Sequence, residues 1–159
     1  MLQLTMHQND PVLCFRCGEC CTRYQVLVEE KEMQQIADYL GISLEQLVTE
    51  YTDARWPIQG KFLLRHLDGR GCIFLTQHGK EFLCSIHKVK PFPCRNWAPA
   101  LAHRECLCGL NRIWGLVVSV NGEICGDNHD KKAFSDFLRS VSVQPVHQSH
   151  KPYHKHIRA

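Results

Sequence analysis

The spacing of apolar residues predicts two amphipathic helices in the first third of the chain. Apolar residues recur at i, i+3, i+4 and i+7 over Met33–Leu40, which is the period of one helix face. Glutamates just before this run favour a helix start, and Gly41 ends the helix. The segment Ser43–Gln46 has the pattern of a capping box, which opens a second helix. A third helix is predicted to begin near Asp130, because apolar residues at helical spacing follow it.

Short β-prone runs between turn residues predict antiparallel strands elsewhere. The predicted strands are residues 24–28, 61–67, 72–75, 82–86, 113–120 and 123–125, with 61–67 and 72–75 joined as a hairpin around 68–71. Asn121-Gly122, a pair typical of two-residue hairpin turns, separates the last two strands. Prolines predict an ordered but irregular loop over residues 90–99. The fold class is therefore α+β, a small single domain with about three helices and cysteine-rich loops organised by metal.

The composition is that of one ordinary globular domain. The chain has 159 residues, 44% of them hydrophobic and 22% charged, and no apolar run is long enough for a bilayer. We expect the domain to span 12–143, between an irregular lead-in at 1–11 and a basic, His-rich, disordered tail at 144–159. The tail holds three bases and no acids, which equals the whole net charge of +3. A neutral body argues against nucleic-acid binding, and no membrane partner is expected.

Ten cysteines are the feature that an ordinary composition leaves unexplained. The chain start lacks the basic and apolar regions of a secretory signal, so we expect a cytoplasmic location. In that reducing compartment, cysteines serve as metal ligands or catalysts more often than in disulfides. An exported protein built on disulfides is the alternative, and it predicts few free thiols after denaturation without reductant.

Four of the cysteines stand close together, as Cys14-Phe15-Arg16-Cys17-Gly18-Glu19-Cys20-Cys21. Two residues between cysteines let a turn present both sulfurs to one ion. The first three cysteines share the C-x2-C-x2-C spacing that begins the bacterial ferredoxin run. Adjacent side chains of an extended chain point to opposite sides, so we expect Cys20 and Cys21 to serve two sites or one bridged site. A redox-active Cys-x-x-Cys dithiol is the other chemical interpretation, although it needs only two cysteines.

Further cysteine motifs follow in a fixed order. They are Cys72-Ile73-Phe74-Leu75, Cys84-Ser85-Ile86-His87-Lys88-Val89-Lys90-Pro91-Phe92-Pro93-Cys94-Arg95, and Arg104-Glu105-Cys106. Together with the first motif they resemble the YkgJ-like family of cysteine-cluster proteins, the zinc- or iron-chelating domains. The family pattern is C-x2-C-x2-C-C, then C-x-F-L, then C-x-I-Y-x-x-R-P-x-x-C-R-x-F-P, then a late cysteine.

The resemblance covers residues 12–110, and the family's cysteines are intact throughout this range. His87, Lys90 and Trp97 replace the family's Tyr, Arg and Phe, and Ala98 is an insertion before a proline. The resemblance implies metal binding. A related flagellin lysine methylase carries such a cysteine region, which leaves methyl transfer open, although the sequence shows no pattern of a substrate or methyl-donor site.

Eight thiols are predicted to bind zinc or iron, enough for two four-sulfur sites. They are Cys14, Cys17, Cys20, Cys21, Cys72, Cys84, Cys94 and Cys106. A four-thiolate zinc site or a cubane cluster carries about two net negative charges, and burying that charge requires cations or N–H donors around it. Arg95, directly after Cys94, is the best candidate for such a partner in the second coordination shell. Zinc or mononuclear iron is favoured, and an iron–sulfur redox protein or cluster-dependent transferase component is the alternative.

Four other residues are weaker ligand candidates. His87 lies three residues after Cys84, a spacing that a metal tolerates. Cys108, Cys125 and His129 would form a separate zinc site together with Cys106. The alternative, that Cys108 and Cys125 are small buried apolar residues, is favoured by the usual behaviour of free cysteine. The sequence leaves open whether the protein has a protein partner.

Overall fold

The computed structural model describes residues 14–55 and 57–143, so the lead-in predicted at 1–11 and the tail predicted at 144–159 lie outside the described residues. The helices are α1 (Glu19–Arg23), α2 (Glu30–Leu40), α3 (Leu44–Tyr51), α4 (Phe92–Arg95), α5 (Arg104–Trp114) and α6 (Asn128–Val143), with a 3-10 helix, η1 (His87–Val89). The strands are β1 (Leu27–Glu29), β2 (Lys61–Leu63), β3 (His66–Leu67), β4 (Gly71–Cys72), β5 (Leu75–His78), β6 (Glu81–Cys84), β7 (Val117–Val118) and β8 (Ile124–Cys125). They form antiparallel pairs, and the α+β class is confirmed.

The two helices with the strongest local signals form where they were predicted. Helix α2 buries Met33 and Ile36 on one face and ends at Gly41, whose N–H donates to two carbonyls of the last turn. The side chain of Ser43 accepts a hydrogen bond of 3.0 Å from the N–H of Gln46, which caps the start of α3. Both helices are therefore determined by local periodicity and capping.

The prediction of about three helices was wrong, because the described residues contain six α-helices. Helices α1 and α4 are single short turns within cysteine motifs, where no apolar periodicity can develop. In α4 the proline at position 93 is tolerated because it lies in the first helical turn. Helix α5 buries Glu105, Cys106, Gly109 and Leu110. Because this buried face includes an acidic residue and a glycine, the spacing of apolar residues does not predict the helix. Its extension to Trp114 shortens the strand expected at 113–120 to β7.

The strand pairs differ from prediction in which segments meet. The predicted strand 61–67 is divided, since β2 pairs with β1 and only β3 pairs with β4. A hairpin between β7 and β8 is confirmed, but its turn is not the predicted two-residue turn. The N–H of Gly122 donates to the Ser119 carbonyl at 2.9 Å, so Val120 and Asn121 are the central residues and Gly122 follows them with φ 81°. Residue 24 lies before β1 rather than in it. Pairing between distant strands depends on packing and not on the local pattern alone.

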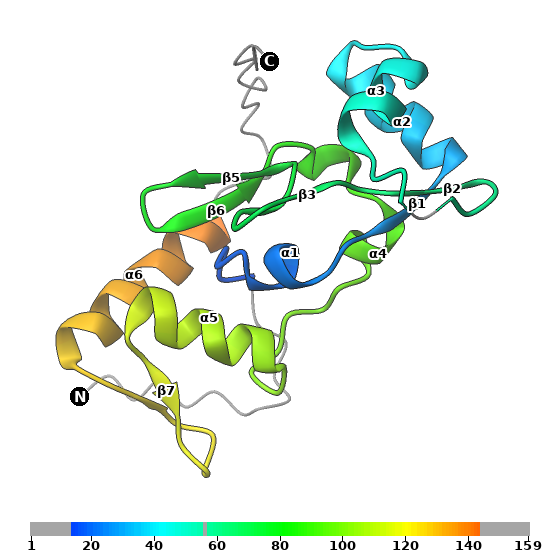
Figure 1. The fold of residues 1–159 in the computed structure, drawn as a ribbon. Helices are drawn as coiled ribbons and strands as arrows, with labels where there is room; N and C mark the ends of the chain where they lie inside the picture. Colours follow the sequence, from blue (N-terminus) through cyan, green and yellow to red (C-terminus); the bar gives the residue numbers. More distant parts are fainter. Residues whose placement is uncertain (1–13, 56, 144–159) are drawn as a thin grey trace.

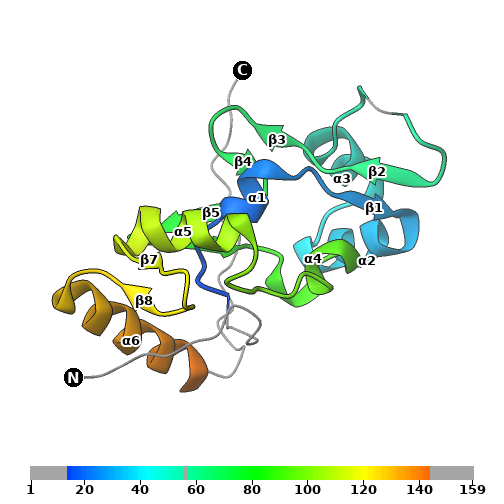
Figure 2. The same ribbon diagram turned by 90° about the horizontal axis from the view of Figure 1, so that it is seen from below.

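Two hydrophobic cores flank helix α1. One core joins α5, α6 and the β7–β8 hairpin, and includes Phe15, Cys17, Leu110 and Phe134. The other joins α2 and α3 with the strands around Leu64. Helix α1 packs against both α5 and β4, and Figures 1 and 2 show it between the two halves of the molecule. The densest cysteine motif therefore lies at the junction of the cores.

Candidate metal centre

The vicinal cysteines lie on a helix and not on the extended chain that we predicted. Gly18 has φ 74° and begins α1, and the N–H of Thr22 donates to its carbonyl at 2.9 Å. In this turn the Sγ atoms of Cys20 and Cys21 are 3.9 Å apart. The edge of a tetrahedron with Zn–S bonds of 2.3 Å is about 3.8 Å. The two sulfurs are therefore spaced as thiolate ligands of one ion or of two adjacent ions.

The turn between Cys14 and Cys17 aims a backbone donor at sulfur. Arg16 has φ 53°, in the left-handed region, and its N–H donates to Cys14 Sγ at 3.4 Å. Hairpin β5–β6 holds this turn, because the N–H of Phe82 donates to the Arg16 carbonyl at 2.7 Å and Arg16 pairs with Glu81 at 2.9 Å. An N–H donor stabilises the charged form of the sulfur, so this geometry suits a thiolate ligand.

One group of thiols lies where this turn meets helix α5. We call it the Cys106 group, and it consists of Cys14, Cys17 and Cys106. Burial raises the pKa of Cys17 to about 11, and the thiols of Cys14, Cys20 and Cys106 contribute to the rise. Without metal this thiol is protonated at neutral pH, so a metal ion must displace its proton.

A second group lies among the strands and α4. We call it the Cys72 group, and it consists of Cys72, Cys84 and Cys94. Burial raises the pKa of Cys72 to about 12 and that of Cys94 to about 11, and the thiol of Cys84 adds to both. The positive charge of Lys90 acts in the opposite direction on Cys84 and Cys94. Lys90 therefore supplies positive charge beside these thiols.

Cys20 connects the two groups. Its hydrogen bond with Cys21 and its burial raise its pKa, and its thiol in turn acts on Cys17 and Cys106 on one side. The same thiol acts on the three members of the Cys72 group. All ten cysteines carry free thiols. Within residues 14–55 and 57–143, no three Cys, His, Asp or Glu side chains are arranged to hold one ion. The chemistry of the thiol donors nevertheless suits zinc or iron.

Arg95 has partners other than the thiols near it in sequence. Its guanidinium pairs with Glu32 at 3.2 Å and donates to the Lys90 carbonyl. The same Glu32 carboxylate accepts a hydrogen bond of 2.7 Å from the N–H of Phe92. Arg95 and Glu32 thus attach the short helix that carries Cys94 to helix α2. Lys90 is the base whose charge lowers the pKa of Cys84 and Cys94, and the sequence did not distinguish it from other nearby bases.

Sequence reasoning also missed two buried carboxylates beside the cysteines. Glu19 pairs with Arg23 at 3.3 Å and with Arg112 at 2.6 Å. Glu105 accepts a hydrogen bond of 2.6 Å from the Tyr24 hydroxyl, which lowers the pKa of Glu105. The one signal in the sequence is their position, since Glu19 lies inside the first motif and Glu105 directly precedes Cys106.

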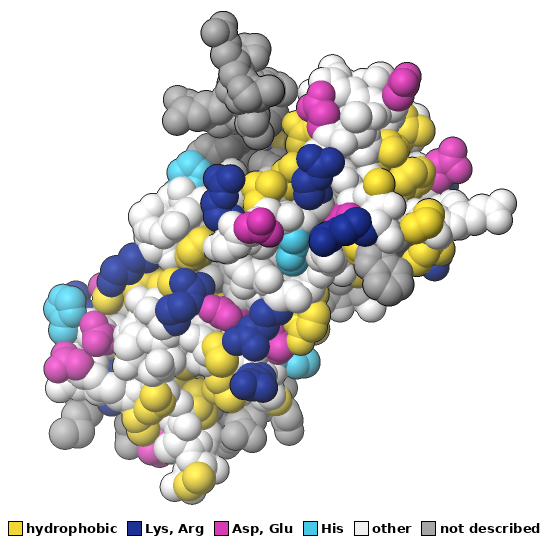
Figure 3. All heavy atoms as spheres, in the orientation of Figure 1, with side chains coloured by type: hydrophobic (Ala, Val, Ile, Leu, Met, Phe, Trp, Pro, Cys, Tyr) yellow, Lys and Arg dark blue, Asp and Glu magenta, His cyan; other side chains and the backbone are white. Residues whose placement is uncertain are grey.

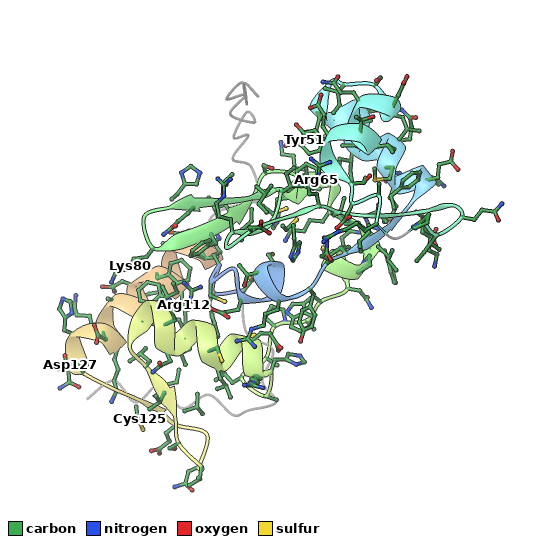
Figure 4. All side chains as sticks on the ribbon, viewed as in Figure 1. Tyr51, Arg65, Lys80, Arg112, Cys125 and Asp127 are labelled. Atoms are coloured by element: carbon green, nitrogen blue, oxygen red, sulfur yellow. The ribbon has the colours of Figure 1, made fainter. Side chains whose placement is uncertain are left out.

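The weaker candidates lie apart in the structure. His87 is exposed, and His129 is 89% exposed with its ring 3.5 Å from Asp130. Cys125 donates to the Glu123 carbonyl at 3.7 Å, and Figure 4 shows it on the side of α5 away from α1. Cys108 and Cys125 are only partly buried, so they are not core residues.

Gly109 allows close packing between α5 and the first cysteine motif. A Cβ at this position would lie 2.3 Å from Cys17 Sγ. We therefore predict that Gly109→Ala destabilises the protein, because overpacking costs about 1–3 kcal/mol and the helix gains only about 1 kcal/mol. Urea unfolding measures the difference. Asn111→Ala, on the exposed part of the same helix, is the control and should be neutral, whereas a stabilised Gly109→Ala would contradict the packing.

The surface shows charges of both signs. Figure 3 shows Lys and Arg side chains across the middle of one face, with Asp and Glu among them.

Among the described residues, no helix is both long enough and apolar enough to cross a membrane.

Comparison with known proteins finds a family that shares the cysteine motifs. No solved structure was found that matches the chain significantly. Residues 13–112 match the CxxCxxCC family, described as a putative zinc- or iron-chelating domain. The match includes every member of the two thiol groups and the vicinal pair. The chain therefore belongs to the CxxCxxCC family of zinc- or iron-chelating domains.

Proposed function

We propose that the protein binds zinc or iron through thiolates in two adjacent centres. One centre takes Cys14, Cys17 and Cys106, and the other takes Cys72, Cys84 and Cys94. The vicinal pair supplies a fourth ligand to each. In this role the metal organises the loops of the domain expected at residues 12–143. The free energy of metal binding then adds to the stability of the folded state.

The observation that carries the proposal is the gathering of thiols around Cys20. Thiols from four separate parts of the chain interact with this one side chain or with its neighbours. Core packing does not account for all of them. Cys17 and Cys106 belong to one core, and Cys72 and Cys84 pack against the other. Cys14 is exposed, however, and Cys20, Cys21 and Cys94 are only partly buried and belong to neither core.

Nearby positive charge and N–H donors support anionic centres. Lys90 lies near the Cys72 group, and the Arg16 N–H points at Cys14. Such partners offset the cost of placing thiolate charge in a partly buried site. The free state of all ten cysteines also favours the reducing cytoplasm over an exported protein built on disulfides.

An iron–sulfur redox protein is the second candidate. The first three cysteines share the spacing of the ferredoxin run, and eight thiols would suffice for two clusters. In that case the same side chains bind iron, and the thiolates and nearby donors tune its reduction potential.

Elemental analysis of protein purified anaerobically from metal-replete cells tests the proposal. We expect two equivalents of zinc or iron per chain, and colourless zinc protein would favour organising centres. Broad absorption at roughly 400 nm would instead indicate sulfur-to-iron charge transfer in a cluster. Protein that is folded, fully reduced and free of both metals would refute metal binding.

A further inference from the structure

We infer that Arg112 is a positioning residue for the centre built on the Cys106 group. Its guanidinium holds the Cys17–Glu19 backbone against helix α5 and balances the buried charge of Glu19. The inference rests on the proposed function, and it adds a residue outside the cysteine motifs.

The guanidinium of Arg112 makes two directed hydrogen bonds to the first cysteine motif. Its Nε donates to Glu19 Oε1 at 2.6 Å, and one terminal nitrogen donates to the Cys17 carbonyl at 2.6 Å. The ring of Phe82 lies below the guanidinium, 5.3 Å away. Figure 4 shows Arg112 on the side of α5 that faces α1. The planar guanidinium carries several donors in a fixed arrangement, which suits it to bind both acceptors at once.

These contacts link two predicted ligands that are far apart in sequence. Helix α5 carries both Cys106 and Arg112, so fixing Arg112 on the Cys17 backbone sets the distance between Cys17 and Cys106. The close contact of Gly109 with Cys17 fixes the same interface sterically. Residues that orient metal ligands in this way typically change metal affinity 10- to 100-fold when replaced.

The position of Glu19 makes the charge of Arg112 important. The Glu19 side chain is 11% exposed and belongs to the segment between Cys17 and Cys20. When those thiols become thiolates, a nearby carboxylate repels them. Two cations counter this repulsion, Arg112 at 2.6 Å and Arg23 at 3.3 Å. Without Arg112, the Glu19 carboxylate keeps only the longer of its two ion pairs, the one with Arg23.

Metal release from loaded protein tests the inference. Wild-type protein and Arg112→Met, each loaded with Zn²⁺, are mixed with excess chromogenic chelator, and the release of each ion is followed. We expect one of the two ions to leave Arg112→Met about 10- to 100-fold faster. Loading with Co²⁺ provides a second readout, since the sulfur-to-cobalt absorption reports the geometry of that centre and should change.

Two further variants separate positioning from general destabilisation. Glu19→Gln/Arg112→Met removes the unbalanced carboxylate and should recover part of the lost affinity. Arg139→Met removes another arginine with a 2.6 Å ion pair, to Asp136 on α6, and should release metal at the wild-type rate. Thermal unfolding of the loaded proteins confirms that each variant is folded.

The outcomes distinguish this inference from the proposed function. Wild-type protein that binds two ions while Arg112→Met releases them at the same rate, with the same Co²⁺ spectrum, would overturn the role of Arg112 alone. A double variant no better than Arg112→Met would also overturn it. Wild-type protein that binds no metal would overturn the proposed function itself.

Discussion

Cys94→Ala and Cys106→Ala are each expected to lower the metal content by half, and their combination should abolish it. Cys94 belongs to the Cys72 group and Cys106 to the Cys106 group. Removing one thiolate from a four-thiolate centre opens its coordination and removes a ligand that a structural site requires. Because Cys94 and Cys106 serve different centres in this proposal, their effects should add.

Metal analysis of the purified variants measures this effect, and Cys125→Ala is the matched control. Cys125 lies on β8, and its thiol donates to the Glu123 carbonyl, so its removal should leave two ions bound. Complete loss of metal in either single variant would indicate one shared centre. Unchanged metal content in both single variants would refute the ligand set.

Removal of the metal is expected to lower the stability of the whole chain. The two hydrophobic cores meet at α1, and the proposed centres link that helix to α5 on one side and to the strands on the other. With free metal at 1,000 times its dissociation constant, each of the two ions contributes about 4 kcal/mol. For a chain of this size, loss of both ions corresponds to a melting temperature lower by about 16–32 °C after chelation.

Thermal unfolding by circular dichroism, with and without chelator under reducing conditions, measures the shift. The Cys94→Ala/Cys106→Ala variant is the control, because its melting temperature should not respond to added metal. A chelated wild-type protein that melts at the same temperature as the loaded protein would show that the metal does not support the fold.

Much of the candidate site could be proposed from the sequence, because closely spaced cysteines are typical of metal sites. The motif at Cys14–Cys21 indicates metal chemistry without any structure, and the later motifs place the chain in its family. The partners of the thiols could not be predicted in the same way. Arg95, chosen for its closeness to Cys94 in sequence, contacts Glu32 and the Lys90 carbonyl, and its role in the second coordination shell stays a prediction.

The missed helix α5 has a similar cause. Its buried face contains Glu105 and Gly109, which no apolar pattern includes. Glu105 is buried because Tyr24 donates to its carboxylate, and Gly109 is needed because Cys17 approaches it. Both reasons lie in other parts of the chain.

By itself, the sequence determined the elements whose causes are local. Helices α2 and α3 follow from apolar spacing and capping, and the β7–β8 hairpin forms around the segment that contains Asn121-Gly122. Only the tertiary structure decided which thiols influence one another, that the thiol of Cys20 acts on members of both groups, and that Arg112 reaches the Cys17 carbonyl. The physical reason is that helix periods and turns depend on adjacent residues, whereas ligand grouping and charge balance depend on how distant segments pack.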